Sequence, residues 1–200
     1  MMLSGWGGVM KRGYAVFDTA IGRCGIAWSD AGIVGVQLPE AREIETRGRL
    51  FRSFPEAREQ SPSANTEIAI EGIVAVLRGD DTDFSDVSLD MSDISPFNQR
   101  VYDCVRGIPR GETRSQDHIA AQLKLPKTTH SVAQALSKNP FMIIVPCHRV
   151  LDAGNGLDKF SPNSGVISKR RLLLLEGSQP KAGLTLFDAL LAVDRPRAAH

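Results

Sequence analysis

A cysteine and a histidine stand side by side in the stretch Pro146-Cys147-His148-Arg149, and they are the residues of this chain best suited to covalent chemistry. A thiolate is the strongest nucleophile among side chains, and an imidazole can take up its proton. Consecutive side chains point apart in an extended chain, so this pair can share a proton only through a bridging water or in a turn. Metal binding by the pair meets the same geometric obstacle, and no CxxC or HxxxH spacing supports it.

The alternative is that Cys147 is an inert core residue, since free cysteine is among the most buried residue types. Three neighbours argue against this alternative: a proline that fixes the backbone before it, the adjacent histidine, and an arginine directly after. The apolar stretch between Pro140 and Pro146 leads into the pair, and we expect this stretch to be buried and rigid. The sequence therefore predicts a reactive cysteine held in a fixed place.

Helical segments surround this stretch. Ser95 and Pro96 are a good cap and first residue for a helix that ends near Gly107. Two short helices, over 115–123 and 128–138, are separated by a break at Leu125-Pro126-Lys127, and such a pair favours a helix-turn-helix. A last helix is predicted over 168–176.

The N-terminal half has a different pattern. Short apolar runs at 14–19, 24–28 and 33–38 are separated by turns that contain Gly or Asp, which is typical of a β-meander. Helical spacing follows over 40–52 and 68–77, with a loop expected at 54–66 between them. The acidic, turn-rich residues 79–92 are predicted to form a linker or a last short strand.

Composition limits the class of protein. The chain has 200 residues and 21.7 kDa, with 42% hydrophobic and 24% charged residues, which is ordinary for a folded, soluble protein. No apolar run approaches the roughly 20 residues that span a bilayer, and the first residues lack the charge order of a secretory signal. Three cysteines are too few and too scattered for a disulfide framework or a four-ligand zinc site. We therefore expect a reduced protein of the cytoplasm.

Charge is divided unevenly along the chain. Residues 1–95 carry 9 Lys and Arg against 15 Asp and Glu, whereas residues 96–177 carry 12 against 6. The net charges are thus −6 and +6, although the whole chain has only +1. The basic half is a candidate for binding a polyanion, but the asymmetry alone does not establish this.

With these residues in view, the chain resembles the O6-alkylguanine-DNA alkyltransferases, also called methylated-DNA–protein-cysteine methyltransferases. Residues 139–150, ending in Ile144-Val145-Pro146-Cys147-His148-Arg149-Val150, resemble the signature of that family. Residues 95–113 resemble the segment before its helix-turn-helix, residues 17–39 its N-terminal meander, and residues 172–177 its closing helix. The resemblance covers roughly residues 14–177.

The resemblance implies an α/β (α+β) fold in two domains. A ribonuclease-H-like β-meander domain would occupy residues 1–92, a helical DNA-binding and alkyl-acceptor domain residues 93–177, and a tail residues 178–200. It also implies a monomer that binds double-stranded DNA containing O6-alkylguanine, flips the damaged base out of the stack and removes its alkyl group without a cofactor. The reaction would be irreversible, so each molecule would act once.

Site residues follow from the resemblance position by position. Cys147 matches the alkyl acceptor, His148 a base that acts through a water, and Glu176 the carboxylate that orients the histidine. The residues implied to form the substrate site or brace its backbone are Asn139, Val145, Arg149, Val150, Phe160 and Ser161. Those implied to bind DNA are Gln116, Lys127, Thr128, His130, Ser131 and Gln134.

Three of these positions depart from the family pattern. His130 replaces an arginine that fills the gap left by the flipped base, and Gln116 replaces a tyrosine that presses on the target phosphate. Phe160 replaces a tyrosine of the guanine pocket, and the glycine-rich loop after it is altered at 161–165. The ligands of the zinc site found in some members are not recognisable, so we expect no metal. The chemistry should be intact, with weakened base flipping, because a neutral His is a weaker wedge than Arg.

Three functions remain open on this reading. The first is transfer of the alkyl group from O6-alkylguanine in DNA to Cys147, and the second is a damage-sensing or regulatory DNA-binding protein of the same family with little transferase activity. Retention of Cys147, His148 and Glu176 favours the first, whereas the departures at Gln116, His130 and Phe160 favour the second. A cysteine hydrolase would additionally need an oxyanion hole and turnover.

Overall fold

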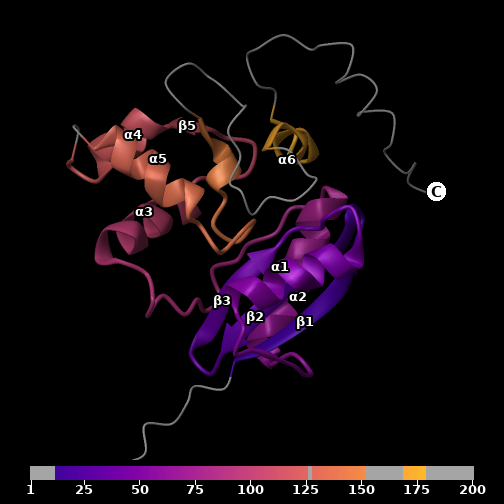
Figure 1. Cartoon of the computed structure of the whole chain (residues 1–200). Helices are drawn as coiled ribbons and strands as arrows, with labels where there is room; N and C mark the ends of the chain where they lie inside the picture. Colours follow the sequence, from indigo (N-terminus) through magenta and orange to yellow (C-terminus); the bar gives the residue numbers. More distant parts are fainter. Residues whose placement is uncertain (1–11, 126–127, 152–168, 179–200) are drawn as a thin grey trace, which may run out of the picture.

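The N-terminal half is built on one four-stranded sheet in the order β3-β2-β1-β4 (Figure 1). The computed structural model describes residues 12–125, 128–151 and 169–178. β1 (Gly13–Thr19), β2 (Gly22–Ser29) and β3 (Gly32–Gln37) form the antiparallel meander that the sequence predicts. β4 (Arg58–Glu59) pairs parallel with β1 and lies in the stretch expected to be a loop, where two polar residues give no strand pattern.

Two helices cover opposite faces of this sheet. On β2, Ile26 and Trp28 belong to the main core together with residues of α2 (Ala64–Arg78), while Ala27 packs with Leu50 of α1 (Glu43–Ser53) on the other face. Successive residues of a strand alternate between the two faces of a sheet, so β2 packs against both helices. Both helices confirm the predicted spacing, although α2 begins four residues earlier than the apolar pattern indicates.

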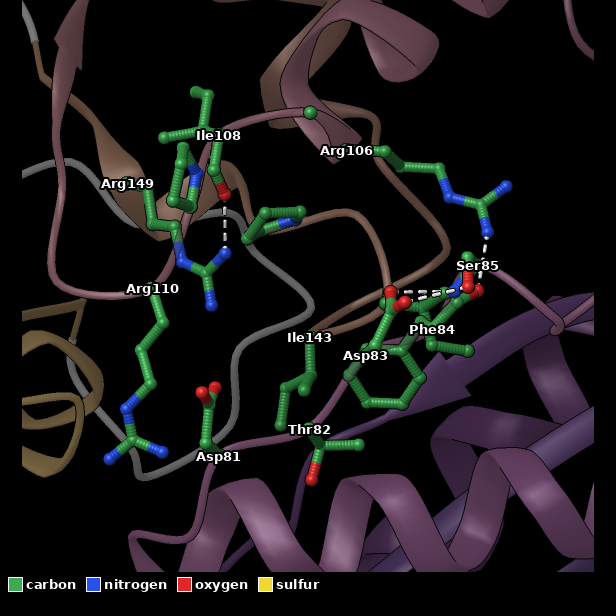
Figure 2. A pocket seen from close by; sticks show the side chains of 14 residues that line it. Asp81, Thr82, Asp83, Phe84, Ser85, Arg106, Ile108, Arg110, Ile143 and Arg149 are labelled. Atoms are coloured by element: carbon green, nitrogen blue, oxygen red, sulfur yellow. Dashed lines mark hydrogen bonds between the residues drawn. The ribbon is translucent and has the colours of Figure 1, made fainter.

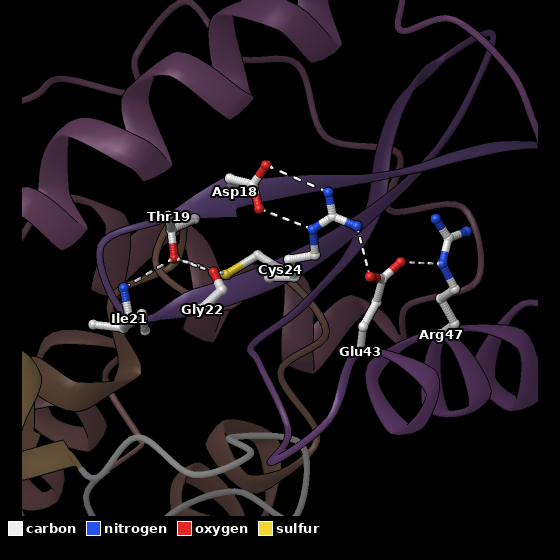
Figure 3. A network of polar contacts seen from close by, with 8 residues as sticks. Asp18, Thr19, Ile21, Gly22, Cys24, Glu43 and Arg47 are labelled. Carbon is white, nitrogen blue, oxygen red and sulfur yellow. Dashed lines mark hydrogen bonds and ion pairs between the residues drawn. The ribbon is translucent and has the colours of Figure 1, made fainter.

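A surface network of ion pairs connects this sheet to α1 (Figure 3). Arg23 on β2 donates to Asp18 at 2.8 Å and to Glu43 at 2.6 Å, and Arg47 donates to the same Glu43 at 2.7 Å. These groups are solvent-exposed, so each pair stabilises the fold by less than about 1 kcal/mol. Close by, the buried thiol of Cys24 lies 3.8 Å from the hydroxyl of Thr19, where it has no base beside it.

The C-terminal half is helical, with α3 (Pro96–Arg106), α4 (Gln116–Gln122) and α5 (Thr129–Ser137) gathered together (Figure 1). Ser95 and Ser115 cap α3 and α4 by accepting hydrogen bonds from the backbone three residues on, as the sequence predicts. The hydroxyl of Thr129 donates to Asp117 at 2.6 Å and so ties α5 to α4. β5 (Arg114–Ser115) and β6 (Val150–Leu151) form a short parallel pair beside them.

The two halves share one hydrophobic core. At the edge of the sheet, the backbone N–H of Val36 donates to the carbonyl of Pro140 at 2.8 Å, and Val36 forms a bridge with Phe141. Residues 79–92 form no strand, but Leu89 makes an isolated bridge to Ile33 on β3. The remaining helix, α6 (Lys169–Leu175), packs against the turn that holds Cys147. In the described part of the chain no helix is long and apolar enough to cross a membrane.

Candidate active site

Cys147 opens a single turn of 3₁₀ helix that spans Cys147–Arg149. The turn supplies the conformation that an extended chain lacks, so neighbouring side chains need not point apart. All residues of the preceding stretch, 141–146, are buried, as expected from its apolar sequence. Cys147 itself is 9% exposed, and its backbone N–H donates to the carbonyl of Val145 at 2.8 Å. The thiol is therefore held in a rigid, nearly closed environment.

Asn139 builds the bend that carries this stretch. Its side-chain amide is fully buried, donates to the carbonyl of Val145 at 2.9 Å, and accepts from the backbone N–H of Phe141 at 3.0 Å. Inside the bend Ile143 has a φ of 74°, a conformation that costs a β-branched residue roughly 1–3 kcal/mol. Strain of this kind persists only where the surroundings fix it, and Asn139 supplies two of the fixing bonds.

His148 lies against a buried carboxylate. Its Nε2 is 2.8 Å from Oε1 of Glu176, and both side chains are 1% exposed. Arg149 donates to the same carboxylate twice, from Nε at 2.9 Å and from Nη2 at 2.8 Å, and its Nη1 donates to the carbonyl of Ile108 at 2.6 Å. One carboxylate thus joins the histidine and the arginine that follow Cys147.

Burial keeps both Cys147 and His148 neutral and works against a proton transfer between them, which Glu176 favours by raising the pKa of His148. Burial raises the pKa of the Cys147 thiol above its usual range, so the thiol needs a base to become a thiolate. Burial lowers the pKa of His148, which keeps the imidazole neutral and able to accept a proton. The hydrogen bonds from His148 and Arg149 outweigh burial at Glu176 and lower its pKa to about 2. An ionised Glu176 accepts from Nε2–H, which leaves Nδ1 as the basic nitrogen of His148.

Two buried or half-buried cations at the site were not singled out from the sequence. The ammonium of Lys169 is buried, donates to the carbonyl of Val150, and acts through its charge to lower the pKa of Cys147, against the larger effect of burial. The sequence could have indicated Lys169, because it lies seven residues, or about two helical turns, before Glu176 and so on the same side of the predicted helix. Arg110 donates to the main chain at Leu175 and Glu176, contacts for which the sequence holds no local signal.

The other residues singled out from the sequence fall into two groups. Asn139, Val145 and Val150 lie beside the Cys147 turn, and Arg149 closes the turn and contacts Glu176 and Ile108. Gln116 opens α4, and His130, Ser131 and Gln134 lie on α5, with His130 and Gln134 exposed. Thr128 precedes α5 and donates its hydroxyl to the carbonyl of Leu125 at 2.6 Å. Phe160, Ser161 and Lys127 lie outside the described residues.

A cavity of about 570 Å³ lies behind the Cys147 turn, between residues 81–85 and residues 106–110 (Figure 2). Pro146 and Arg149 line it, but Cys147 does not, so this cavity is not where the thiol would meet a substrate. Within residues 12–125, 128–151 and 169–178, no cluster of three or more His, Cys, Asp or Glu side chains is arranged to hold a metal ion.

Comparison with known proteins finds relatives of this chain. A family model described as "6-O-methylguanine DNA methyltransferase, DNA binding domain" matches residues 96–178. A methylated-DNA–protein-cysteine methyltransferase of Mycobacterium bovis is 43% identical over 120 residues, covering 60% of this chain and 70% of that protein. A methylated-DNA–protein-cysteine methyltransferase of Methanothermobacter thermautotrophicus is 31% identical over 153 residues, which cover 76% of this chain and 78% of that protein.

A solved structure gives the same result at the level of the fold. The crystal structure of Mycobacterium tuberculosis OGT in complex with DNA is 31% identical, covers 82% of this chain and 91% of that one, and superposes with a TM-score of 0.65. The mixed α/β architecture is therefore shared with this solved relative. The chain belongs to the family of methylated-DNA–protein-cysteine methyltransferases.

Proposed function

We propose that this protein repairs DNA by moving the alkyl group of O6-alkylguanine onto Cys147 in a single irreversible step. The observation that carries the proposal is the buried contact between His148 and Glu176 directly beside Cys147, in a chain whose relatives are named for this transfer. Its partner is DNA, in line with the DNA-binding family model and the relative crystallised on DNA. The names of these relatives favour repair over the regulatory alternative.

In the proposed reaction, Nδ1 of His148 takes the thiol proton of Cys147 through a water. The sulfur then forms a bond to the alkyl carbon while the bond from that carbon to O6 breaks, and its electron pair stays with guanine. Guanine gains a proton on its ring, and His148 gives up the thiol proton to water in exchange, so the products are an ordinary guanine, a neutral His148 and a thioether on Cys147. A thioether is stable, and this explains why one molecule would act once.

Glu176 is proposed to orient His148 rather than to exchange protons. Its pKa of about 2 keeps it ionised throughout the neutral range, and an ionised carboxylate favours the tautomer with hydrogen on Nε2. Arg149 holds the carboxylate from the other side with two hydrogen bonds. Asn139, Val145 and Val150 are proposed to shape the pocket beside the thiol, together with Phe160 and Ser161.

For DNA binding we propose that α4 and α5 act as a helix-turn-helix, with Gln116, Lys127, Thr128, His130, Ser131 and Gln134 at the duplex. Charge supports this, since residues 96–177 carry a net charge of +6. We further propose that residues 1–92 form a ribonuclease-H-like domain and residues 93–177 the alkyl-acceptor domain. The protein is proposed to act as a monomer in the cytoplasm.

The test is intact mass after incubation with DNA that contains O6-methylguanine. Wild-type protein should gain one methyl group and no more, and Cys147→Ala should gain none while still binding DNA. Cys24→Ala and Cys104→Ala are the matched controls and should react like the wild type, because burial raises the pKa of these thiols as it does that of Cys147, and neither has an adjacent histidine to take its proton. Methylation of Cys24 or Cys104 in place of Cys147, or turnover beyond one equivalent, would contradict the proposal.

A further inference from the structure

Arg110 occupies an unusual place, in the turn between α3 and β5. Its Nη2 donates to the carbonyl of Gly79 at 2.5 Å and to that of Leu175 at 2.9 Å, and its Nε lies 3.4 Å from the carbonyl of Glu176. Gly79 ends α2 and Leu175 ends α6, so one guanidinium binds the last carbonyls of two helices from the two halves of the chain.

The chemistry of that position suits an arginine. The last carbonyls of a helix have no partner within the helix, and they carry the negative end of its dipole. A guanidinium is planar and has five donors, so it can serve several carbonyls at once, whereas an ammonium is a single point of charge. The left-handed conformation of Gly79, with φ of 99°, ends α2 at the residue whose carbonyl accepts from Arg110.

Glu176 is consequently held at both of its ends. Its carboxylate accepts from His148 and Arg149, and its own carbonyl and that of Leu175 accept from Arg110. The orientation of His148 depends on where this carboxylate stands, because their contact is a single hydrogen bond of 2.8 Å. A shift of the 175–176 peptide would move the carboxylate on which that bond depends.

We propose that Arg110 is a positioning residue for the alkyl transfer: by binding the carbonyls of Gly79, Leu175 and Glu176, it fixes the carboxylate that orients His148. This inference rests on the proposed function. It gives the N-terminal half a part in the chemistry, since Gly79 anchors the guanidinium while α2 carries none of the residues proposed to react. Figure 2 shows Arg110 and Arg149, the two arginines that hold Glu176, at the same cavity.

Arg106 offers a matched control. It also reaches from the C-terminal half to backbone carbonyls of the N-terminal half, donating to Phe84 at 2.7 Å and to Val87 at 3.2 Å. Within the described part of the chain, the side chain of Arg106 donates hydrogen bonds to Phe84 and Val87 and to no residue of α6. Loss of Arg106 therefore loosens the contact between the halves without releasing the peptide of Glu176.

The experiment measures single-turnover labelling by O6-benzylguanine as the free base, followed by intact mass from pH 5.5 to 9, so that DNA binding plays no part. Arg110→Met should lower the labelling rate by roughly fivefold or more, the effect of losing about 1 kcal/mol. The acidic limb of its pH–rate profile should move to lower pH, because a displaced Glu176 no longer offsets the effect of burial on the pKa of His148. Arg110→Lys keeps the charge with fewer bonds and should give an intermediate rate, and it serves as the test variant if Arg110→Met does not fold.

Arg106→Met should keep the wild-type rate and profile even where it lowers the melting temperature. Equal labelling by wild type and the Arg110 variants, or the same slowing and shift in Arg106→Met, would overturn the inference while leaving the proposed function intact. Absence of methyl transfer from O6-methylguanine DNA to the wild-type protein would overturn the proposed function and this inference with it; if only the free base fails to react, the same variants are compared on that DNA.

Discussion

Replacing Glu176 with Gln removes one charge from the buried centre while keeping the size of the side chain. In the wild type, Oε1 accepts from His148 and Arg149, and Oε2 accepts from Arg149. A glutamine offers only one oxygen, and its NH₂ group must face one of these donors. The variant therefore loses a charge-assisted contact and gains a donor–donor conflict in a site that is 1% exposed.

The size of the effect follows from the pKa of Glu176. A folded-state pKa of about 2, in place of 4.5, corresponds to about 3 kcal/mol of stability at neutral pH. Three hydrogen bonds contribute to it, one from His148 and two from Arg149. If they contribute equally, the His148 bond accounts for about 1 kcal/mol, which corresponds to an alkylation rate lower by about fivefold.

Two assays check this prediction. Urea unfolding should give a free energy of unfolding about 3 kcal/mol lower for Glu176→Gln at pH 7. Because the pKa of Glu176 is lower in the folded state, its contribution is present above about pH 4.5 and is lost as the pH falls toward 2, so the two proteins should converge there. Labelling by O6-benzylguanine should be slower with unchanged stoichiometry.

A surface carboxylate supplies the control. Glu112 pairs with Arg114 at 2.6 Å on the outside of the protein, and Glu112→Gln should change stability by less than about 1 kcal/mol. A Glu176→Gln protein that labels at the wild-type rate would show that the carboxylate merely ends α6. A stability difference that stays constant from pH 7 to pH 2 would refute the link between its charge and the fold.

Three further predictions concern His130 at the proposed DNA interface, Asn139 in the bend before Cys147, and Ser95 at the start of α3. His130→Arg should speed transfer on duplex DNA more than on single-stranded DNA or free base, since an arginine recovers more of the cost of flipping; equal effects on all three in single-turnover assays would remove His130 from the flipping step. Asn139→Ala should lower the free energy of unfolding by roughly 1–3 kcal/mol in urea, because it leaves the buried N–H of Phe141 unpaired and removes one of the two donors to the carbonyl of Val145, and an unchanged free energy of unfolding would contradict its role. Ser95→Ala should cost about 1 kcal/mol in thermal unfolding through loss of the α3 cap without changing the labelling rate.

Local signals in the sequence predicted the elements well. The β-meander follows from alternating apolar runs and Gly turns, and α3 and α4 follow from capping serines whose bonds are formed within four residues. β4 was missed because it has only two residues, both exposed, and its pairing with β1 depends on the chain returning from α1. An element that owes its existence to a distant partner has no pattern of its own.

The residues of the site also differ in whether the sequence alone could identify them. Cys147 and His148 could be chosen from their chemistry alone, but Glu176 lies 28 residues beyond His148 and was predicted only through the family resemblance. Spacing within a helix fixes which residues share a face, so Lys169 was within reach of reasoning from the sequence once Glu176 had been chosen.

Neither the chemistry of its residue type nor its spacing within a helix indicates a role for Arg110. Its carbonyl partners lie 31 and 65 residues away, and a backbone carbonyl can belong to any residue type. A sequence can show which side chains are able to react, since reactivity belongs to residue types. What holds them in place is often main chain, and bonds from side chains to main chain become visible only once the fold has brought the segments together. The dependence of His148 on Gly79, through Arg110 and Glu176, is of this second kind, and the comparison of Arg110→Met with Arg106→Met tests it directly.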